Sequence, residues 1–166
     1  GRSTTLHTKK LVKDLAPLIG AARSEFSEAA LAPQAGGYLA ELPIGITSTH
    51  VLYVNEKMLK DLGLTVPKTY EELKAMAPKL KAAGKDVILM GAQDDWVMQS
   101  CLYSAIVGRM LGDKYVDDLI AGKAKFTDAP FVNTLKFYKQ LYTDGVLSVK
   151  SLQTPYNEVN GLFASG

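Results

Sequence analysis

One short stretch of the sequence combines side chains that could hold a polar ligand. Residues 91–96 read Gly-Ala-Gln-Asp-Asp-Trp and contain the single tryptophan of the chain, Trp96. An indole ring packs on the apolar C–H face of a sugar, while an amide and carboxylates hydrogen-bond to hydroxyl groups. Gln93, Asp94, Asp95 and Trp96 are therefore suited to a polyhydroxylated ligand. The alternative is that Asp94 or Asp95 only caps a helix and that Trp96 packs in the core.

Arrangements for catalysis or metal binding are poorly represented by comparison. His7 and His50 are the only 2 histidines, and no Gly-x-Ser-x-Gly motif is present. The acidic pairs at 94–95 and 117–118 have no histidine nearby in sequence, which argues against a metal site. Phosphate-binding glycine motifs are also missing. We therefore expect no catalytic residue, no metal and no cofactor.

Charge is balanced along the chain. The 19 basic and 17 acidic side chains give a net charge of +2, and the two signs are interspersed. The basic residues at 9–10 and within 79–85 are typical of solvated helix faces, so we do not expect nucleic-acid binding.

Cysteine content and hydropathy add few constraints. Cys101 is the single cysteine, so no internal disulfide can form. No run of about 18 apolar residues is present, and no signal peptide is visible. The abrupt ends at Gly1 and Gly166 favour a fragment that is cut at both sides.

The elements around residues 91–96 would place that loop at the end of a strand. Residues 87–90 form a short apolar run that predicts a strand, and a helical pattern runs from Asp94 or Asp95 to Leu111. Ligands tend to bind where strands of open α/β sheets end. Residues 49–54 are rich in β-branched and aromatic types and predict a second, buried strand.

Helix periodicity and capping residues predict the remaining elements. Asn55 and Thr69 are placed as N-caps, and Glu72 would complete a capping box by reaching back to the Thr69 amide. Pro78 predicts a kink or break. Asp128 would cap a helix whose buried face carries Phe131, Leu135, Tyr138 and Tyr142. We expect helices over residues 9–19, 25–31, 56–62, 70–83, 115–120, 131–142 and 155–164. The order of elements is that of an α/β fold dominated by helices.

Several motifs occur together in the order and spacing of one protein family. Residues 41–43 (ELP), 48–60 (STHVLYVNEKMLK) and 63–64 (GL) resemble a run "LP…ST-x-VLYYNKDLFKKLGL". Residues 66–73 (VPKTYEEL) and 79–85 (KLKAAGK) match "PKTWEEL" and "KLKAAGK", and the chain ends on "FASG". From about Leu15 to its last residue the chain thus resembles family 1 extracellular solute-binding proteins, the sugar-receptor group that includes maltose-binding protein.

The resemblance implies a type II periplasmic-binding-protein-like fold. Two α/β lobes joined by hinge strands close over a ligand in that family. Residues 1–37 would be the tail end of the first lobe, residues 38–43 the hinge crossing, and residues 44–166 a second lobe truncated at its C-terminus. The second lobe would be helix-rich with a small, mostly parallel sheet.

The resemblance also implies a function and a site. The chain would belong to the substrate-binding component of an ABC importer, a monomer located in the periplasm or anchored to the cell surface as a lipoprotein. It would bind a sugar or similar solute without chemistry and dock on a membrane permease. The matching positions for ligand contact are Thr47, Ser48, Thr49, Asp94, Asp95 and Trp96. Asp95 stands where the family loop has proline.

Two other readings remain compatible with the residues. One is a carbohydrate-active enzyme domain, because a carboxylate pair could be drawn from the 17 acidic residues although no spacing selects one. The other is a helical interaction domain without a small ligand, which would be favoured by a dry core around Trp96.

Overall fold

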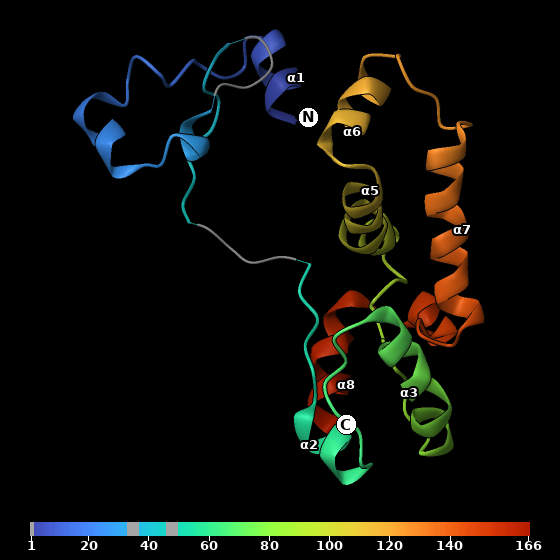
Figure 1. Ribbon diagram of the computed structural model, residues 1–166. Coiled ribbons are helices and arrows are strands. Elements are labelled where there is room, and N and C mark those ends of the chain that lie inside the picture. The colour runs from blue at the N-terminus through green and yellow to red at the C-terminus, as the bar shows by residue number, and fades with distance from the viewer. Residues whose placement is uncertain (1, 33–36, 46–49) are drawn as a thin grey trace. The chain divides into compact units, whose positions relative to one another are not determined.

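The structure is a computed structural model that describes residues 2–32, 37–45 and 50–166. The chain divides into two compact units, residues 1–48 and 49–166. Most of the helices belong to the second unit (Figure 1). The assignment of lobes and of a hinge at residues 38–43 stays a prediction.

The first unit has little regular structure after its first helix. α1 spans Arg2–Thr8, and two short 3₁₀ helices follow at Gly20–Glu25 and Ala29–Leu31. The predicted helix over residues 9–19 is therefore wrong, and of the helix predicted over residues 25–31 only a short 3₁₀ turn at its end is seen.

A backbone conformation and a side-chain effect explain the missing helix at residues 9–19. Lys10 adopts a left-handed backbone with φ of 57°, which ends α1. The Asp14 carboxylate accepts hydrogen bonds from the amides of Leu39 at 2.9 Å and Ala16 at 3.0 Å. A side chain that takes backbone amides in this way competes with helix formation. The same amides, that of Leu39 first, lower the pKa of Asp14.

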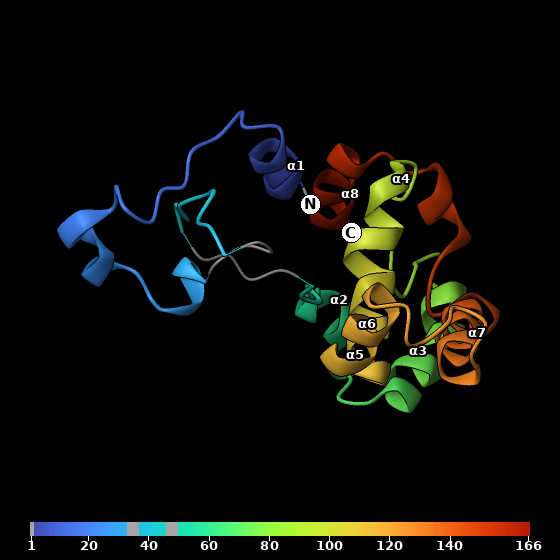
Figure 2. The same ribbon diagram turned by 90° about the horizontal axis from the view of Figure 1, so that it is seen from above.

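The second unit is built from helices and short helical turns. α2 is Glu56–Asp61, α3 is Tyr70–Ala82, α4 is Asp95–Val97, α5 is Ser104–Leu111, α6 is Asp113–Ile120, α7 is Ala129–Thr143 and α8 is Val159–Ser165. A π-helical stretch, Met98–Tyr103, joins α4 to α5, and 3₁₀ helices lie at Val149–Gln153 and Tyr156–Glu158. Figure 2 shows α4, the π stretch and α5 running end to end, as the sequence predicts for residues 94–111.

The caps of α2 and α3 lie where the sequence places them. The Asn55 side chain accepts from the Met58 amide at 2.9 Å, and the Thr69 hydroxyl accepts from the Glu72 amide at 3.2 Å. The Glu72 carboxylate accepts from the amide of Lys68 at 2.7 Å, one residue earlier than the expected Thr69. α3 also continues past Pro78 to Ala82, so the predicted break is wrong.

Two clusters of buried side chains share neighbours and form one core. Met98, Ile106, Leu141, Val146 and Leu147 make up the larger cluster. The smaller one, Leu59, Met76 and Leu80, comes from α2 and α3. Leu73 and Val87 pack against both clusters. Leu73 of α3 and Val87 thus connect the two clusters, and burying each apolar side chain of this core contributes about 1.5–3 kcal/mol.

The predicted strands and the small parallel sheet are not confirmed in the described residues. One parallel bridge pairs Ile88 with Leu147, through hydrogen bonds of 3.0 Å from Ile88 N to Val146 O and from Ser148 N to Ile88 O. Residues 50–54 form no strand, and Val51, Leu52 and Tyr53 are exposed. An apolar strand is stabilised by a neighbour to which it bonds, and no described segment pairs with residues 50–54.

The buried face of α7 follows the predicted one at Tyr138 and Tyr142, which pack against the core, but not at Leu135. Leu135 is 46% exposed, whereas Thr134 and Leu141 are buried. Thr134 can be buried because its hydroxyl donates to the Phe131 carbonyl at 2.7 Å and lies 2.8 Å from the Tyr103 hydroxyl. α7 packs against α5 on this side (Figure 1). Asp128 precedes α7 but bonds to the Lys125 amide at 2.8 Å, so it is not the expected side-chain cap.

Asp144 ties the end of α7 to α3. It accepts a hydrogen bond of 2.7 Å from the Tyr70 hydroxyl and lies 3.2 Å from the Lys74 ammonium. The Tyr70 bond, together with Lys74, lowers the pKa of Asp144 below its ordinary 3.8. Burial, reinforced by the carboxylate, raises the pKa of Tyr70 to about 12, so the phenol remains a donor at neutral pH.

This pair predicts an acid-sensitive contribution to stability. Because the pKa of Asp144 is lower in the folded state, the ionised carboxylate stabilises the fold at pH values above its unfolded pKa, near 3.8. This stabilisation is lost as the pH falls through the folded-state pKa. We expect Asp144→Asn to melt below wild type at pH 7 and the gap to close on acidification. Thermal midpoints of Asp144→Asn and wild type, recorded as a function of pH, measure this difference. Asp117→Asn, on the exposed face of α6, is the control and should show no such gap; a gap for Asp144→Asn that persists at pH 2 contradicts the account.

Candidate functional site

Two segments far apart in sequence are joined around the loop at residues 91–96. The amides of Met90 and Ala92 donate to the side chain and carbonyl of Ser151, at 3.0 and 2.8 Å. The Gln93 amide donates to the Thr154 carbonyl at 3.1 Å. Ser151 is fully buried, with 0% of its surface exposed. The loop is thus held by a partner segment about sixty residues later in the chain, which the local sequence does not reveal.

Removing the Ser151 hydroxyl tests how firmly this loop is held. Ser151→Ala leaves the Met90 amide without its acceptor in a buried position, which costs about 1–3 kcal/mol. We expect the free energy of unfolding to fall by that amount in urea denaturation. Ser165→Ala, at an exposed site in α8, should stay within about 0.5 kcal/mol of wild type. Equal losses in the free energy of unfolding for the two substitutions would show that the hydrogen bond from the Met90 amide to Ser151 does not stabilise the fold.

Gly91 lets the two segments approach. A Cβ atom built on Gly91 would lie 2.8 Å from the Tyr156 nitrogen and 3.0 Å from the Pro155 oxygen, and closer still to the Tyr156 Cα. Gly91 itself is buried. Any side chain at this position would therefore push residues 155–156 away from the loop.

The contact at the end of the loop brings a second aromatic ring to Trp96. The Asp94 carboxylate accepts a hydrogen bond of 2.8 Å from the Tyr156 amide. The Trp96 and Tyr156 rings lie 4.9 Å apart between centroids, tilted by 60°. Both side chains remain about half exposed, Trp96 at 47% and Tyr156 at 53%. The loop therefore presents a pair of aromatic rings on a hydrogen-bonded support.

The structure separates the roles predicted for the loop residues. Trp96 is exposed, so the alternative in which it packs in the core is wrong for this unit. Asp94 sits at the N-cap of α4 but makes no side-chain cap bond, since its carboxylate is taken by the Tyr156 amide. Asp95 is exposed, and no described residue forms a hydrogen bond or ion pair with its carboxylate. Gln93 is exposed beside them.

The other half of the predicted site lies outside the described residues. Thr47, Ser48 and Thr49 are all in this group. The first residue described after them, His50, has a left-handed backbone with φ of 59°. Its Nε2 lies 3.0 Å from the Ser100 carbonyl, which requires a proton on Nε2 because a carbonyl only accepts. His50 thus contacts the π stretch that directly follows α4, and π turns are frequent at functional sites.

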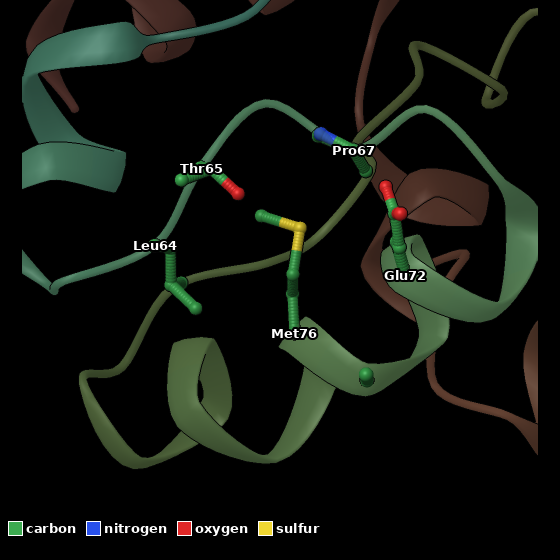
Figure 3. Close-up of a pocket in the computed structure, with 6 residues that line it drawn as sticks. Leu64, Thr65, Pro67, Glu72 and Met76 are labelled. Atoms are coloured by element: carbon green, nitrogen blue, oxygen red, sulfur yellow. The ribbon is translucent and has the colours of Figure 1, made fainter.

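Two hollows on the second unit lie away from this loop. One of about 200 Å³ is lined by Leu64, Thr65, Pro67, Glu72, Ala75 and Met76, and a neighbouring one reaches α2. Figure 3 shows the Met76 side chain pointing into the first hollow beside Leu64 and Thr65. The carboxylate at its edge, Glu72, is already bonded to the Lys68 amide. The second hollow is lined by the charged side chains of Glu56, Lys57 and Lys60, but by no aromatic ring, so we place the candidate site at Trp96.

The described part of the chain offers neither a metal-binding cluster nor a membrane-spanning helix. It contains no group of three or more His, Cys, Asp or Glu side chains placed to share a metal ion. None of its helices has the length and apolar character needed to cross a membrane.

Comparison with known proteins agrees with this arrangement of helices and loops. The chain belongs to the family described as bacterial extracellular solute-binding protein, which it matches over residues 5–166. Members of this family are binding proteins.

Curated relatives are considerably longer than the chain. The sn-glycerol-3-phosphate-binding periplasmic protein UgpB of Yersinia pestis is 30% identical over 105 residues, which cover 57% of this chain and 24% of UgpB. UgpB of Yersinia enterocolitica is 29% identical over the same shares. The chain thus spans 24% of the length of the curated relatives it matches.

Solved structures share the fold at low identity. A chitin oligosaccharide binding protein superposes with a TM-score of 0.68 at 22% identity, covering 93% of this chain and 39% of that one. A protein solved in connection with xylan utilization by the thermophilic bacterium Caldanaerobius polysaccharolyticus superposes with a TM-score of 0.75 at 19% identity. The match covers 92% of this chain and 39% of that one. The bacterial solute receptor AcbH superposes with a TM-score of 0.63 at 17% identity, and the match covers 99% of this chain and 42% of that one. These likenesses establish a periplasmic-binding-protein-like fold.

Proposed function

We propose that the chain supplies one wall of a sugar-binding cleft in the substrate-binding component of an ABC importer. The observation that carries the proposal is the exposed Trp96 ring on a loop held by four hydrogen bonds to residues 151–156. An exposed aromatic ring offers an apolar face on which the C–H face of a sugar can stack. Membership of the solute-binding family supports the same function.

The proposed ligand-contacting residues are Thr47, Ser48, Thr49, Asp94, Asp95 and Trp96. The hydroxyls of Ser48 and Thr49 and the Asp95 carboxylate would hydrogen-bond to sugar hydroxyls beside the indole. Support for joining the two groups comes from His50, which follows Thr49 directly and bonds to Ser100 near Trp96. Asp94 would contribute to the same site although one of its oxygens is used by Tyr156.

A neutral solute suits this site better than a phosphate ester. Asp94 and Asp95 carry negative charge beside Trp96, and uncompensated carboxylates repel an anion. Two of the structural neighbours bind sugars, a chitin oligosaccharide and β-D-galactopyranose, while UgpB binds sn-glycerol 3-phosphate. We therefore place a neutral sugar or oligosaccharide first and a glycerol phosphate second.

The remaining parts of the proposal follow from the family. Residues 1–37 would close the first lobe, residues 38–43 would cross between lobes, and residues 44–166 would form most of the second lobe. The protein would act as a monomer in the periplasm or as a surface lipoprotein, deliver its sugar to a membrane permease and perform no chemistry itself.

Calorimetric titration of the full-length protein tests this function. The probes are chitobiose, a xylo-oligosaccharide, D-galactose and sn-glycerol 3-phosphate. We expect binding in the micromolar range or tighter for at least one neutral sugar, and no release of chromophore from nitrophenyl glycosides. Binding of the phosphate ester alone would overturn the choice of a neutral ligand, and steady glycoside turnover would favour the enzyme reading.

A further inference from the structure

We propose that Tyr156 is a second ligand-contacting ring and that Asp94 is the positioning residue that holds it beside Trp96. This inference rests on the proposed function and adds residues that the sequence patterns did not select. Tyr156 lies sixty residues after Trp96 in the chain, at the start of the 3₁₀ helix Tyr156–Glu158.

The first argument is the exposure of the two rings. Trp96 and Tyr156 lie 4.9 Å apart, yet each leaves about half of its surface uncovered, 47% and 53%. Two large adjacent rings that only packed the core would be expected to cover each other and be covered by neighbours. Instead, two partly exposed rings lie next to each other at the end of the loop.

The second argument is that the backbone under Tyr156 is fixed from both sides. The Tyr156 amide donates to the Asp94 carboxylate at 2.8 Å, a charge-assisted bond between the two segments. Gly91 allows residues 155–156 to pack directly on the loop backbone. Pro155 restricts the residue before Tyr156 to a φ of −62°. A ring held on so rigid a backbone loses little entropy when it binds a ligand.

The third argument concerns how the Tyr156 side chain is used. No described residue forms a hydrogen bond with its hydroxyl, and its ring contact is with Trp96. The part of the side chain that we assign to ligand contact is the exposed ring beside Trp96. A pair of inclined rings gives apolar contact to more than one face or unit of a sugar, so the site favours an oligosaccharide, or a pyranose with an extended C–H face, over a small polyol.

The test of the positioning role needs no ligand. Amide hydrogen exchange in the full-length protein should show the Tyr156 amide protected. Asp94→Ala should speed its exchange at least about tenfold, while Asp94→Asn, whose amide oxygen can still accept, should retain most of the protection. Asp95→Ala removes the same charge one residue away and should leave this exchange rate unchanged. Unchanged protection in Asp94→Ala would overturn the positioning role.

The test of the ligand role uses the neutral sugars named above. For a sugar that the wild type binds, Tyr156→Ala should weaken binding at least about fivefold and Tyr156→Phe should bind nearly as wild type. If Tyr156→Ala keeps full affinity while Trp96→Ala loses it, the ligand role of Tyr156 is overturned and the proposed function stands. If no sugar binds the wild type, the proposed function and the ligand role fall together, and hydrogen exchange still decides the role of Asp94.

Discussion

Replacing Gly91 with alanine is expected to damage both the stability and the ligand affinity of the protein. The new methyl group would lie 2.8 Å from the Tyr156 nitrogen and 3.0 Å from the Pro155 oxygen, where contacts of about 3.5 Å or more are needed. Neither obstacle is a flexible side-chain tip, so backbone must move. Forcing a group into such a site costs about 1–3 kcal/mol, and the shift would displace Tyr156 and its bond to Asp94.

Urea denaturation and sugar titration of Gly91→Ala measure the two effects. Gly108→Ala is a matched control because a Cβ at Gly108, inside α5, meets no atom within 4 Å. That control should gain about 0.5–1 kcal/mol of stability, as expected for alanine in a helix, and bind normally. Wild-type stability and affinity in Gly91→Ala would show that residues 155–156 do not pack against the loop as described.

Replacing Trp96 with alanine is expected to lower affinity much more than stability. Loss of a stacked, desolvated ring costs about 1–3 kcal/mol of binding free energy. The fold should lose less, because the ring is 47% exposed and its described ring partner is Tyr156 alone. The measurement is paired: the dissociation constant for the bound sugar and the thermal midpoint of the same variant.

A second exposed aromatic provides the control for Trp96. Phe126, between α6 and α7, is 67% exposed and contacts the ring of Phe131 with centroids 5.0 Å apart. Phe126→Ala removes a comparable ring from the same unit and should leave affinity unchanged. A collapsed midpoint with normal affinity in Trp96→Ala would give Trp96 a structural role only and would contradict the proposed site.

The elements that depend on local rules could be predicted from the sequence. Asn55 and Thr69 start α2 and α3 because their side chains cap amides three residues later. Gly63 and Gly112 end helices in left-handed conformations, with φ of 61° and 75°, that other residues adopt at a cost. Such signals lie within a few residues, so one sequence is enough to find them.

Elements that depend on distant partners could not be predicted in the same way. Residues 50–54 have the composition of a buried strand, but pairing decides whether a strand forms, and no described segment pairs with them. Residues 9–19 have helical periodicity, but Asp14 bonds to Leu39 twenty-five residues away. In both places a contact, or its absence, far along the chain overrides local preference.

The candidate site shows the same division. Residues 91–96 could be singled out by their side chains alone, including the tryptophan that proves to be exposed. Tyr156 and Ser151 were missed, since nothing in their local sequence links them to this loop. The nearest local signal is Gly91, which follows the predicted strand at residues 87–90 and permits the close approach of residues 155–156.

The most direct test of the central claim is to observe the contact between sugar and indole. Nuclear Overhauser effects between the C–H protons of a bound neutral sugar and the Trp96 indole protons can be measured in the full-length protein. The account predicts such effects for the sugar that binds most tightly, and their loss in Trp96→Ala. A tightly bound sugar whose protons show effects to other residues and none to Trp96 would contradict it.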